Sequence, residues 1–169
     1  IAGQLLEEFF RLGSELCFEV VSGAMNPHLS DLNHLAEEHG NITIHSNVRN
    51  MSELMKDCDV AISAGGSTMY ELGAVGVPTL CFSFVDNQER LAESFGKKGF
   101  AAYMGNYLEN GRQLIRSICT ETAELSEDFE ARVNLSRRAR GLVDGLGAER
   151  IANELRKEDC DEENKELEL

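Results

Sequence analysis

Three kinds of pattern are missing from this 169-residue chain, and each absence excludes a class of protein. No run approaches 18 uninterrupted apolar residues and the amino end has no basic-then-apolar signal pattern, so neither membrane insertion nor secretion is expected. Basic residues are scarce, with 16 Lys and Arg against 30 Asp and Glu, so a nucleic-acid clamp is not expected. The five cysteines form no C-x-x-C pair, which predicts reduced, mostly buried thiols in a cytoplasmic protein, without metal or disulfide framework.

What remains is the composition of one globular domain followed by an acidic tail. Apolar residues make up 42% of the chain and charged residues 27%. Seven acids and two lysines lie in residues 157–169, a segment with no aromatic residue. We therefore expect a domain over residues 1–157 and a solvated tail, disordered or a frayed helix, over residues 158–169. The helical pattern begins almost at Ile1, so we expect the chain to start inside a larger protein.

Short apolar runs alternate with segments of helical periodicity along the first two thirds of the chain. Nearly continuous apolar strands of this kind are typical of a parallel sheet covered by helices on both faces. The sequence thus predicts a doubly wound, Rossmann-like α/β domain with a helical carboxyl-terminal part. The expected strands are residues 16–21, 41–45, 59–63, 78–82 and 100–103, and the expected helices are residues 1–12, 28–39, 51–58, 68–75 and 87–97.

Sheets of this class bind ligands beyond the carboxyl ends of their strands. The strongest local pattern there is Gly65-Gly66-Ser67-Thr68, between an expected strand and an expected helix. The glycines let a backbone approach a ligand closely, and the helix N-terminus and the hydroxyls favour a phosphate. The pattern is neither G-x-G-x-x-G nor a P-loop, because no Lys follows the glycines. The alternative is an ordinary turn in which Thr68 caps the helix.

Glu71 has two interpretations. Thr68 and Glu71 have the spacing of a capping box, in which the Glu side chain returns to the backbone of the cap residue. Alternatively, the carboxylate binds the hydroxyls of a ribose whose phosphates rest on the same helix terminus. The spacing is compatible with both.

Two further loops end at the same edge. The backbone around Val48 could meet the edge of a base, or the loop is a turn in which Asn50 caps the next helix. The amides of Asn87 and Gln88 could bind sugar hydroxyls, or Asp86 or Asn87 caps a helix. His28, His34 and His39 have no second cluster of ligands and are interpreted as surface histidines.

Taken together, residues 47–55, 59–72, 76–79 and 86–88 resemble the carboxyl-terminal half of the GT-B nucleotide-sugar enzymes. The likeness is closest to the family of the pseudaminic-acid UDP-sugar hydrolase and the spore-coat polysaccharide protein. The D-G-x-G-A-x-R segment at residues 144–150 favours the hydrolase, and the peptidoglycan N-acetylglucosaminyltransferase is more distantly similar.

The resemblance implies a UDP-sugar site without a cofactor. It places the pyrophosphate on Gly65, Gly66, Ser67 and Thr68, the ribose on Glu71, uracil on the backbone at Val48, and the sugar on Asn87 and Gln88. It also implies that two parts of the family's enzymes are missing here. The catalytic histidine lies in an amino-terminal lobe, and a strand in the middle of the sheet comes before the helix that begins at Ile1. We therefore expect a UDP-binding half of a nucleotide-sugar hydrolase, with a glycosyltransferase and a non-catalytic interaction module as alternatives.

Overall fold

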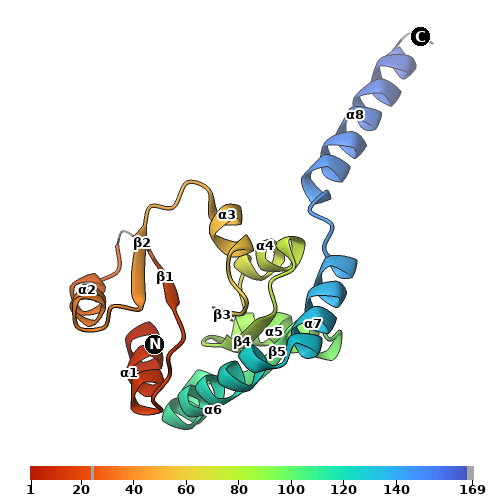
Figure 1. The fold of residues 1–169 in the computed structure, drawn as a ribbon. Coiled ribbons are helices and arrows are strands. Elements are labelled where there is room, and N and C mark those ends of the chain that lie inside the picture. Colours follow the sequence, from red (N-terminus) through yellow and green to blue (C-terminus); the bar gives the residue numbers. More distant parts are fainter. Residues whose placement is uncertain (24, 167–169) are drawn as a thin grey trace.

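The computed structural model describes residues 1–23 and 25–166, with side chains as far as residue 156 (Figure 1). Helices and strands alternate as far as residue 127, and two further helices follow. The order is α1 (Ala2–Arg11), β1 (Phe18–Ser22), α2 (Leu29–Glu38), β2 (Ile42–Ser46), α3 (Met51–Lys56), β3 (Ala61–Ala64), α4 (Thr68–Val75), β4 (Thr79–Ser83), α5 (Asp86–Lys97), β5 (Ala102–Asn106), α6 (Tyr107–Glu127), α7 (Phe129–Leu142) and α8 (Gly147–Glu166). Every strand pair is parallel, which confirms the predicted Rossmann-like α/β class.

The strands form two sheets rather than one. β3, β4 and β5 pair in that order, with β4 buried throughout and helices on both faces. One face packs on α3, α4, α5 and α7 around Phe95 and Phe100, and the other on α1 and α6 around Phe9 and Ile118. β1 and β2 form a separate pair with α1 and α2 on one face. Their opposite face lies open, since Glu19, Val21 and Thr43 are exposed, so the prediction of helices on both faces fails for this pair.

The break falls where the resemblance implies a missing central strand. The Phe18 N–H donates to the Asn41 carbonyl, so alternation turns the N–H groups of Glu19 and Val21 away from β2. The Ala61 N–H donates to the Pro78 carbonyl. By the same alternation, the N–H groups of Ile62 and Ala64 point away from β4. At the break, β1 and β3 therefore each present a strand edge without a pairing partner among the described residues.

Hydrogen exchange tests these open edges. The amide protons of Glu19, Val21, Ile62 and Ala64 are expected to exchange about a hundredfold or more faster than those of β4, because unpaired N–H groups need no unfolding to meet water. Two-dimensional NMR in deuterated buffer measures both sets. Equal protection would contradict the split and show that another strand occupies the edges.

α1 connects the two sheets. Leu5 and Phe9 pack in the cluster shared with α6 and β4, whereas Leu6 packs in the cluster shared with α2 and β2. Phe9 is 2% exposed, and its ring centroid lies 4.9 Å from that of Phe18 in β1. Packing through this helix thus supplies the cohesion that strand pairing would supply in an unbroken sheet.

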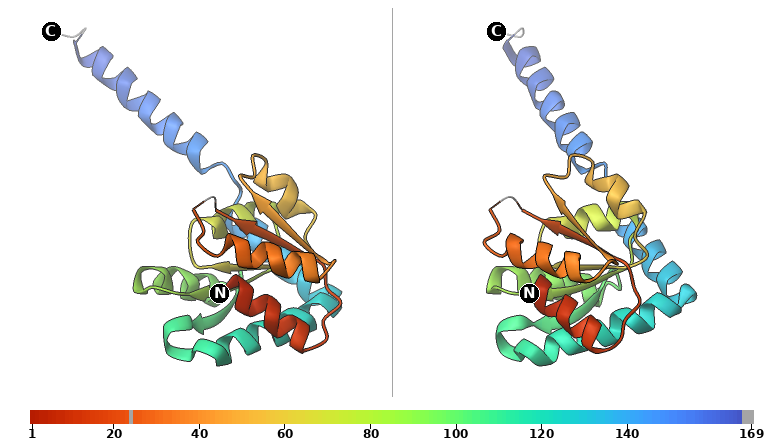
Figure 2. Two further views of the ribbon diagram at one scale, coloured as in Figure 1. Left: turned by 90° about the vertical axis from the view of Figure 1, so that its left-hand side faces the viewer. Right: turned by 60° about the vertical axis from the view of Figure 1, so that its left-hand side comes forward.

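The carboxyl-terminal part is helical, as predicted. α6 bends at Gly111, whose φ is 46°, and α7 begins where the Asp128 side chain accepts a hydrogen bond from the Ala131 N–H. α8 then extends away from the rest of the domain (Figure 2). The predicted acidic tail lies outside the residues whose side chains are described. No described helix is both long enough and apolar enough to span a bilayer.

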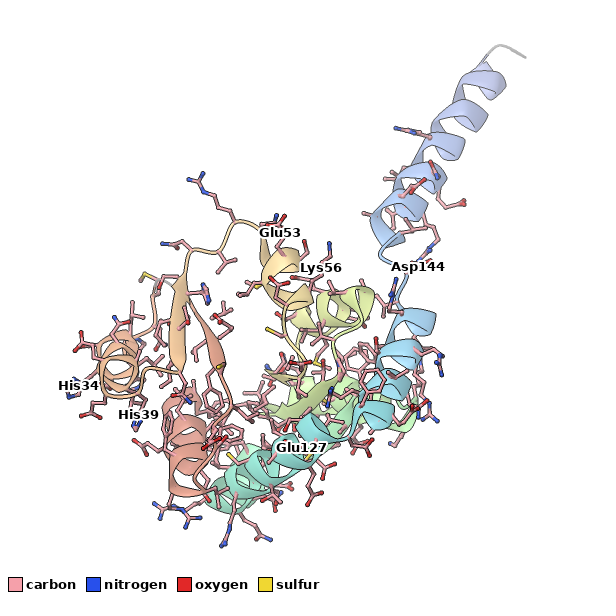
Figure 3. All side chains as sticks on the ribbon, in the orientation of Figure 1. His34, His39, Glu53, Lys56, Glu127 and Asp144 are labelled. Atoms are coloured by element: carbon pink, nitrogen blue, oxygen red, sulfur yellow. The ribbon has the colours of Figure 1, made fainter. Side chains whose placement is uncertain are left out.

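The turn between α7 and α8 is fixed by Asp144 (Figure 3). Its carboxylate accepts from both guanidinium nitrogens of Arg150, at 2.6 and 3.1 Å, and from the Leu146 N–H at 3.0 Å. Gly145 between them has a φ of 77°, which a glycine adopts without strain. The D-G-x-G-A-x-R segment therefore has a structural role, with its charged ends closing a turn.

Acid titration tests that turn. The Arg150 guanidinium, followed by the Leu146 N–H, lowers the pKa of Asp144 from 3.8 to about 2. Because the folded-state pKa is the lower one, the pair stabilises the turn fully above about pH 4 and loses this contribution as the pH falls through about 2. NMR titration of the Asp144 carboxyl measures the value, and in Arg150→Gln we expect it to return towards 3.8. An unchanged pKa in Arg150→Gln would contradict the assignment.

The cysteines agree in part with the sequence prediction. Cys81 and Cys119 are buried, and burial raises the pKa of each thiol to about 12. Cys58 is half-buried and Cys17 is exposed, so most of the described thiols are at least half-buried, as expected. Cys160 lies outside the residues whose side chains are described.

Candidate functional site

The turn between β3 and α4 places Gly65 and Gly66 at the carboxyl edge of the sheet. Gly65 is buried, and its N–H donates to the Phe82 carbonyl of β4 at 2.8 Å. A Cβ on Gly65 would lie 2.8 Å from the Cβ of Ala92 and 3.0 Å from the Gln88 carbonyl oxygen, so the close approach of α5 requires a glycine there. A Cβ on Gly66 would meet nothing within 4 Å. Gly66 is thus the glycine that faces open space.

The first turn of α4 leaves polar groups unengaged. The Met69 N–H donates to the Gly66 carbonyl and the Tyr70 N–H to the Ser67 carbonyl. The N–H groups and hydroxyls of Ser67 and Thr68 have no hydrogen-bond partner among the described residues, and both side chains are exposed. Two backbone donors and two hydroxyls therefore surround the positive end of α4, an arrangement that suits a phosphate oxygen.

Glu71 lies in the first turn of the same helix. The N-cap of α4 is Ser67, without a side-chain capping bond, so the alternative in which Thr68 caps the helix is wrong. The predicted capping box with Glu71 does not form either, because Thr68 is already inside the helix. The exposed carboxylate of Glu71 forms no hydrogen bond or ion pair with another described residue. It is therefore available to a ligand.

The loop around Val48 has an unusual backbone. Asn47 has a φ of 55°, a left-handed conformation that Asn tolerates better than most residues. A turn is one of the two alternatives predicted for this loop, but the left-handed Asn47 was missed, although Asn between a strand and a helix is a signal for it. The N–H and C=O of Val48 have no backbone partner among the described residues. Asn50 occupies the N-cap of α3, but its side chain accepts from the Ser52 hydroxyl rather than from a helix N–H.

The two amides at the start of α5 differ in their surroundings. The Gln88 Oε1 accepts from the Phe84 N–H at 3.0 Å, which holds the turn after β4 and leaves the amide NH₂ as a donor. Asn87 is exposed, and no described group bonds to its side chain. The N-cap of α5 is Val85, so the alternative in which Asp86 or Asn87 caps this helix is wrong.

The candidate residues at the starts of α4 and α5 lie close together, whereas Val48 lies in a separate loop. Gly65 contacts the Gln88 backbone, and Tyr70 of α4 packs edge-on against Phe95 of α5 with ring centroids 5.3 Å apart. The pyrophosphate and sugar candidates are therefore neighbours. Val48 belongs to the loop after β2, in the other sheet, and this loop leads into α3, which packs against α4.

The described histidines form no catalytic or metal cluster. His34 and His39 lie at α2, at the side of the molecule away from β3–β5 (Figure 3). His34 faces Glu37 and Glu38, and the His39 ring stacks on Phe10 with centroids 3.6 Å apart. No group of three His, Cys, Asp or Glu suited to a metal ion occurs among the described residues.

A curated relative shares the polysaccharide context of the resemblance. The chain is 31% identical over 132 residues to the spore coat polysaccharide biosynthesis protein SpsG of Bacillus subtilis. The match includes 78% of this chain and 38% of that protein, so the chain spans well under half the length of this relative. An uncharacterised protein of Methanocaldococcus jannaschii is 31% identical over 98 residues, 56% of this chain and 20% of that one.

Solved glycosyltransferases share the fold. The glycotransferase of kitacinnamycin superposes with a TM-score of 0.66 at 22% identity, over 92% of this chain and 38% of that one. The pneumococcal O-GlcNAc transferase GtfA, solved with UDP and GlcNAc, superposes with a TM-score of 0.60 at 16% identity, over 92% of this chain and 32% of that one. The family described as the glycosyltransferase family 28 C-terminal domain matches residues 7–143, most of this chain. The chain therefore belongs to that family, and its fold is the carboxyl-terminal half of a GT-B enzyme.

Proposed function

We propose that this chain is the nucleotide-sugar-binding half of a UDP-sugar glycosyltransferase that acts in surface polysaccharide synthesis. The supporting observation is the first turn of α4, where two backbone N–H groups and two hydroxyls lie unengaged one helical turn from the free Glu71 carboxylate. In this proposal Gly66, Ser67 and Thr68 hold the pyrophosphate while Gly65 sets the packing that positions them. The family match and the UDP-bound neighbour support the same ligand class.

The other contacts of the proposed site follow from their positions. Glu71 accepts hydrogen bonds from the ribose hydroxyls, and the backbone at Val48 meets the uracil edge. Asn87 and the NH₂ of Gln88 bind the sugar. The rest of a longer, cytoplasmic protein would supply the second lobe, position the acceptor and activate its hydroxyl.

We propose that the full-length protein transfers the sugar to an acceptor rather than hydrolysing the UDP-sugar. None of the similar proteins reported above is described as a hydrolase. The segment at residues 144–150 that favoured a hydrolase closes the turn between α7 and α8 through its Asp144–Arg150 pair. That structural role accounts for the segment without any catalytic task.

Calorimetry with this chain tests the ligand. We expect UDP to bind in the micromolar to millimolar range, UMP more weakly and uridine weakest, because each phosphate removed loses contacts at the α4 terminus. Absence of binding by all three would favour the non-catalytic interaction module. Equal binding of UDP and uridine would contradict the pyrophosphate assignment.

Isotope labelling of the full-length protein separates transfer from hydrolysis. In water enriched in oxygen-18, a glycosyltransferase given an acceptor forms an unlabelled glycoside. Release of free sugar carrying the label would establish hydrolysis and overturn the transferase assignment.

A further inference from the structure

A cluster of arginines on α7 stands out in a chain of net charge −14. α7 carries four arginines and a single acid, Glu130. The arginines lie within nine consecutive residues, 132–140, at Arg132, Arg137, Arg138 and Arg140.

Two glycines let these side chains pack closely onto the domain. A Cβ on Gly76, which ends α4 with a φ of 86°, would lie 2.5 Å from the Cδ of Arg140. A Cβ on Gly99 would lie 2.6 Å from a guanidinium nitrogen of Arg138. Between them Ala139 is 0% exposed. The stems are thus held by packing while Arg137, Arg138 and Arg140 remain exposed as residues.

Three of the arginines line a cavity of about 520 Å³. Arg132, Arg137 and Arg140 form one wall together with Ser136 of α7. The opposite wall comes from the chain just before β3 and β4. The cavity therefore opens at the amino ends of these strands, at the opposite edge of the sheet from the turn that holds Ser67. Its full lining is Cys58, Asp59, Pro78, Arg132, Val133, Ser136, Arg137 and Arg140.

No internal anion neutralises this wall. Within the part of the chain whose side chains are described, Arg132, Arg137 and Arg140 have no carboxylate within ion-pair distance. Arg132 donates instead to the Leu125 and Ser126 carbonyls at the end of α6, which fixes its orientation. Asp59 is the only acid in the lining. Three arginines and one acidic residue thus line the cavity.

We propose that this cavity binds a phosphoryl group, held by Arg137 and Arg140 and oriented by Arg132. A guanidinium matches a phosphate with two parallel N–H donors, which a lysine cannot do. The cavity volume falls in the range of small-molecule sites. The ligand is a soluble phosphorylated compound or the phosphate headgroup of a lipid, since both present the same group. This site is separate from the proposed nucleotide site and does not depend on it.

NMR of the arginine side chains with inorganic pyrophosphate tests the proposal. The Nε–Hε signals of Arg137 and Arg140 are assigned by their loss in Arg137→Gln and Arg140→Gln. We expect both signals to shift saturably in the unchanged protein. Because the readout is local, binding of pyrophosphate at the α4 turn does not interfere with it. Absence of a saturable shift with pyrophosphate, together with absence of binding to vesicles that contain phosphatidylglycerol, would overturn the proposal.

Matched variants distinguish a specific binding site from non-specific attraction of the anion to surface arginines. Pyrophosphate affinity at this site, followed through Arg132 Nε–Hε, is expected to fall about tenfold or more in the double variant Arg137→Gln/Arg140→Gln. The control Arg112→Gln/Arg116→Gln removes the same charge from exposed positions of α6 and is expected to change it less than about twofold. Asp59→Asn is expected to strengthen binding. Equal losses in the two double variants would overturn the proposal.

A vesicle experiment identifies the source of the phosphate. The chain is sedimented with vesicles of phosphatidylcholine alone and with added phosphatidylglycerol. Binding that requires phosphatidylglycerol and is lost in Arg137→Gln/Arg140→Gln supports the lipid headgroup. Saturable pyrophosphate binding without vesicle binding supports the soluble ligand.

Discussion

Replacing Glu71 by alanine is expected to weaken UDP binding by about 1–3 kcal/mol, the contribution of hydrogen bonds to a charged acceptor. The carboxylate is exposed and has no partner among the described residues, so the substitution should change folding stability by less than about 0.5 kcal/mol. Calorimetric titration with UDP measures the first effect and thermal unfolding the second. Glu130→Ala is the matched control, because Glu130 is also an exposed acid in a first helical turn but lies on α7.

The sign of the change decides between two roles for Glu71. A carboxylate that merely lies near bound phosphates repels them, so its removal would tighten UDP binding. If the carboxylate instead holds the ribose hydroxyls, its removal weakens UDP binding, even though the repulsion of the phosphates is relieved. Tighter or unchanged binding in Glu71→Ala would therefore overturn the ribose assignment.

A thermodynamic cycle localises the contact on the ribose. With 2′-deoxy-UDP in place of UDP, the loss caused by Glu71→Ala is expected to shrink, because one hydroxyl partner is already missing. The UDP affinity of Glu71→Gln is expected to lie between those of the unchanged protein and Glu71→Ala, since the amide still accepts a hydrogen bond but has no charge. Equal losses for UDP and 2′-deoxy-UDP would mean that Glu71 acts elsewhere on the nucleotide.

Local pattern predicted the helices better than the ends of the strands. α4 was expected at residues 68–75 and occupies those positions, because Gly76 ends it in the left-handed conformation. β5 was expected at residues 100–103 but begins at Ala102. Phe100 and Ala101 are 2% and 3% exposed in the bend before it, and apolar composition does not separate a buried bend from a strand.

At the candidate site, the sequence predicted which residues share an edge of the sheet but not the contacts that each of them makes. The order of the β–α turns placed Ser67, Glu71 and Gln88 at one edge, because parallel strands end together. The sequence could not decide whether Thr68 and Glu71 form a capping box, since that depends on where the helix begins. It also could not reveal the Gln88 bond to the Phe84 N–H, or that Gly65 is needed for packing against α5. Such contacts depend on tertiary distances.

Replacing Phe9 by alanine is expected to destabilise the protein by about 3–5 kcal/mol, the usual cost of removing a buried ring. Phe9 is 2% exposed and packs against Phe18 and the α6 cluster, at the helix that joins the two sheets. β1 and β3 do not pair, so few other contacts hold the β1–β2 unit to β3–β5. Denaturant unfolding followed by NMR at residues of each sheet measures the loss, and we expect the β1–β2 unit to unfold first.

Phe9→Ala also bears on ligand recognition, because the proposed UDP contacts are divided between the sheets. Val48 follows β2, whereas Ser67 and Glu71 follow β3. Loosening α1 is therefore expected to reduce the preference for UDP over ADP while much of the diphosphate affinity remains. Phe10→Ala is the control, since Phe10 stacks on His39 within the β1–β2 unit. If base preference survives Phe9→Ala unchanged, or both sheets unfold together, the nucleotide site does not depend on this junction.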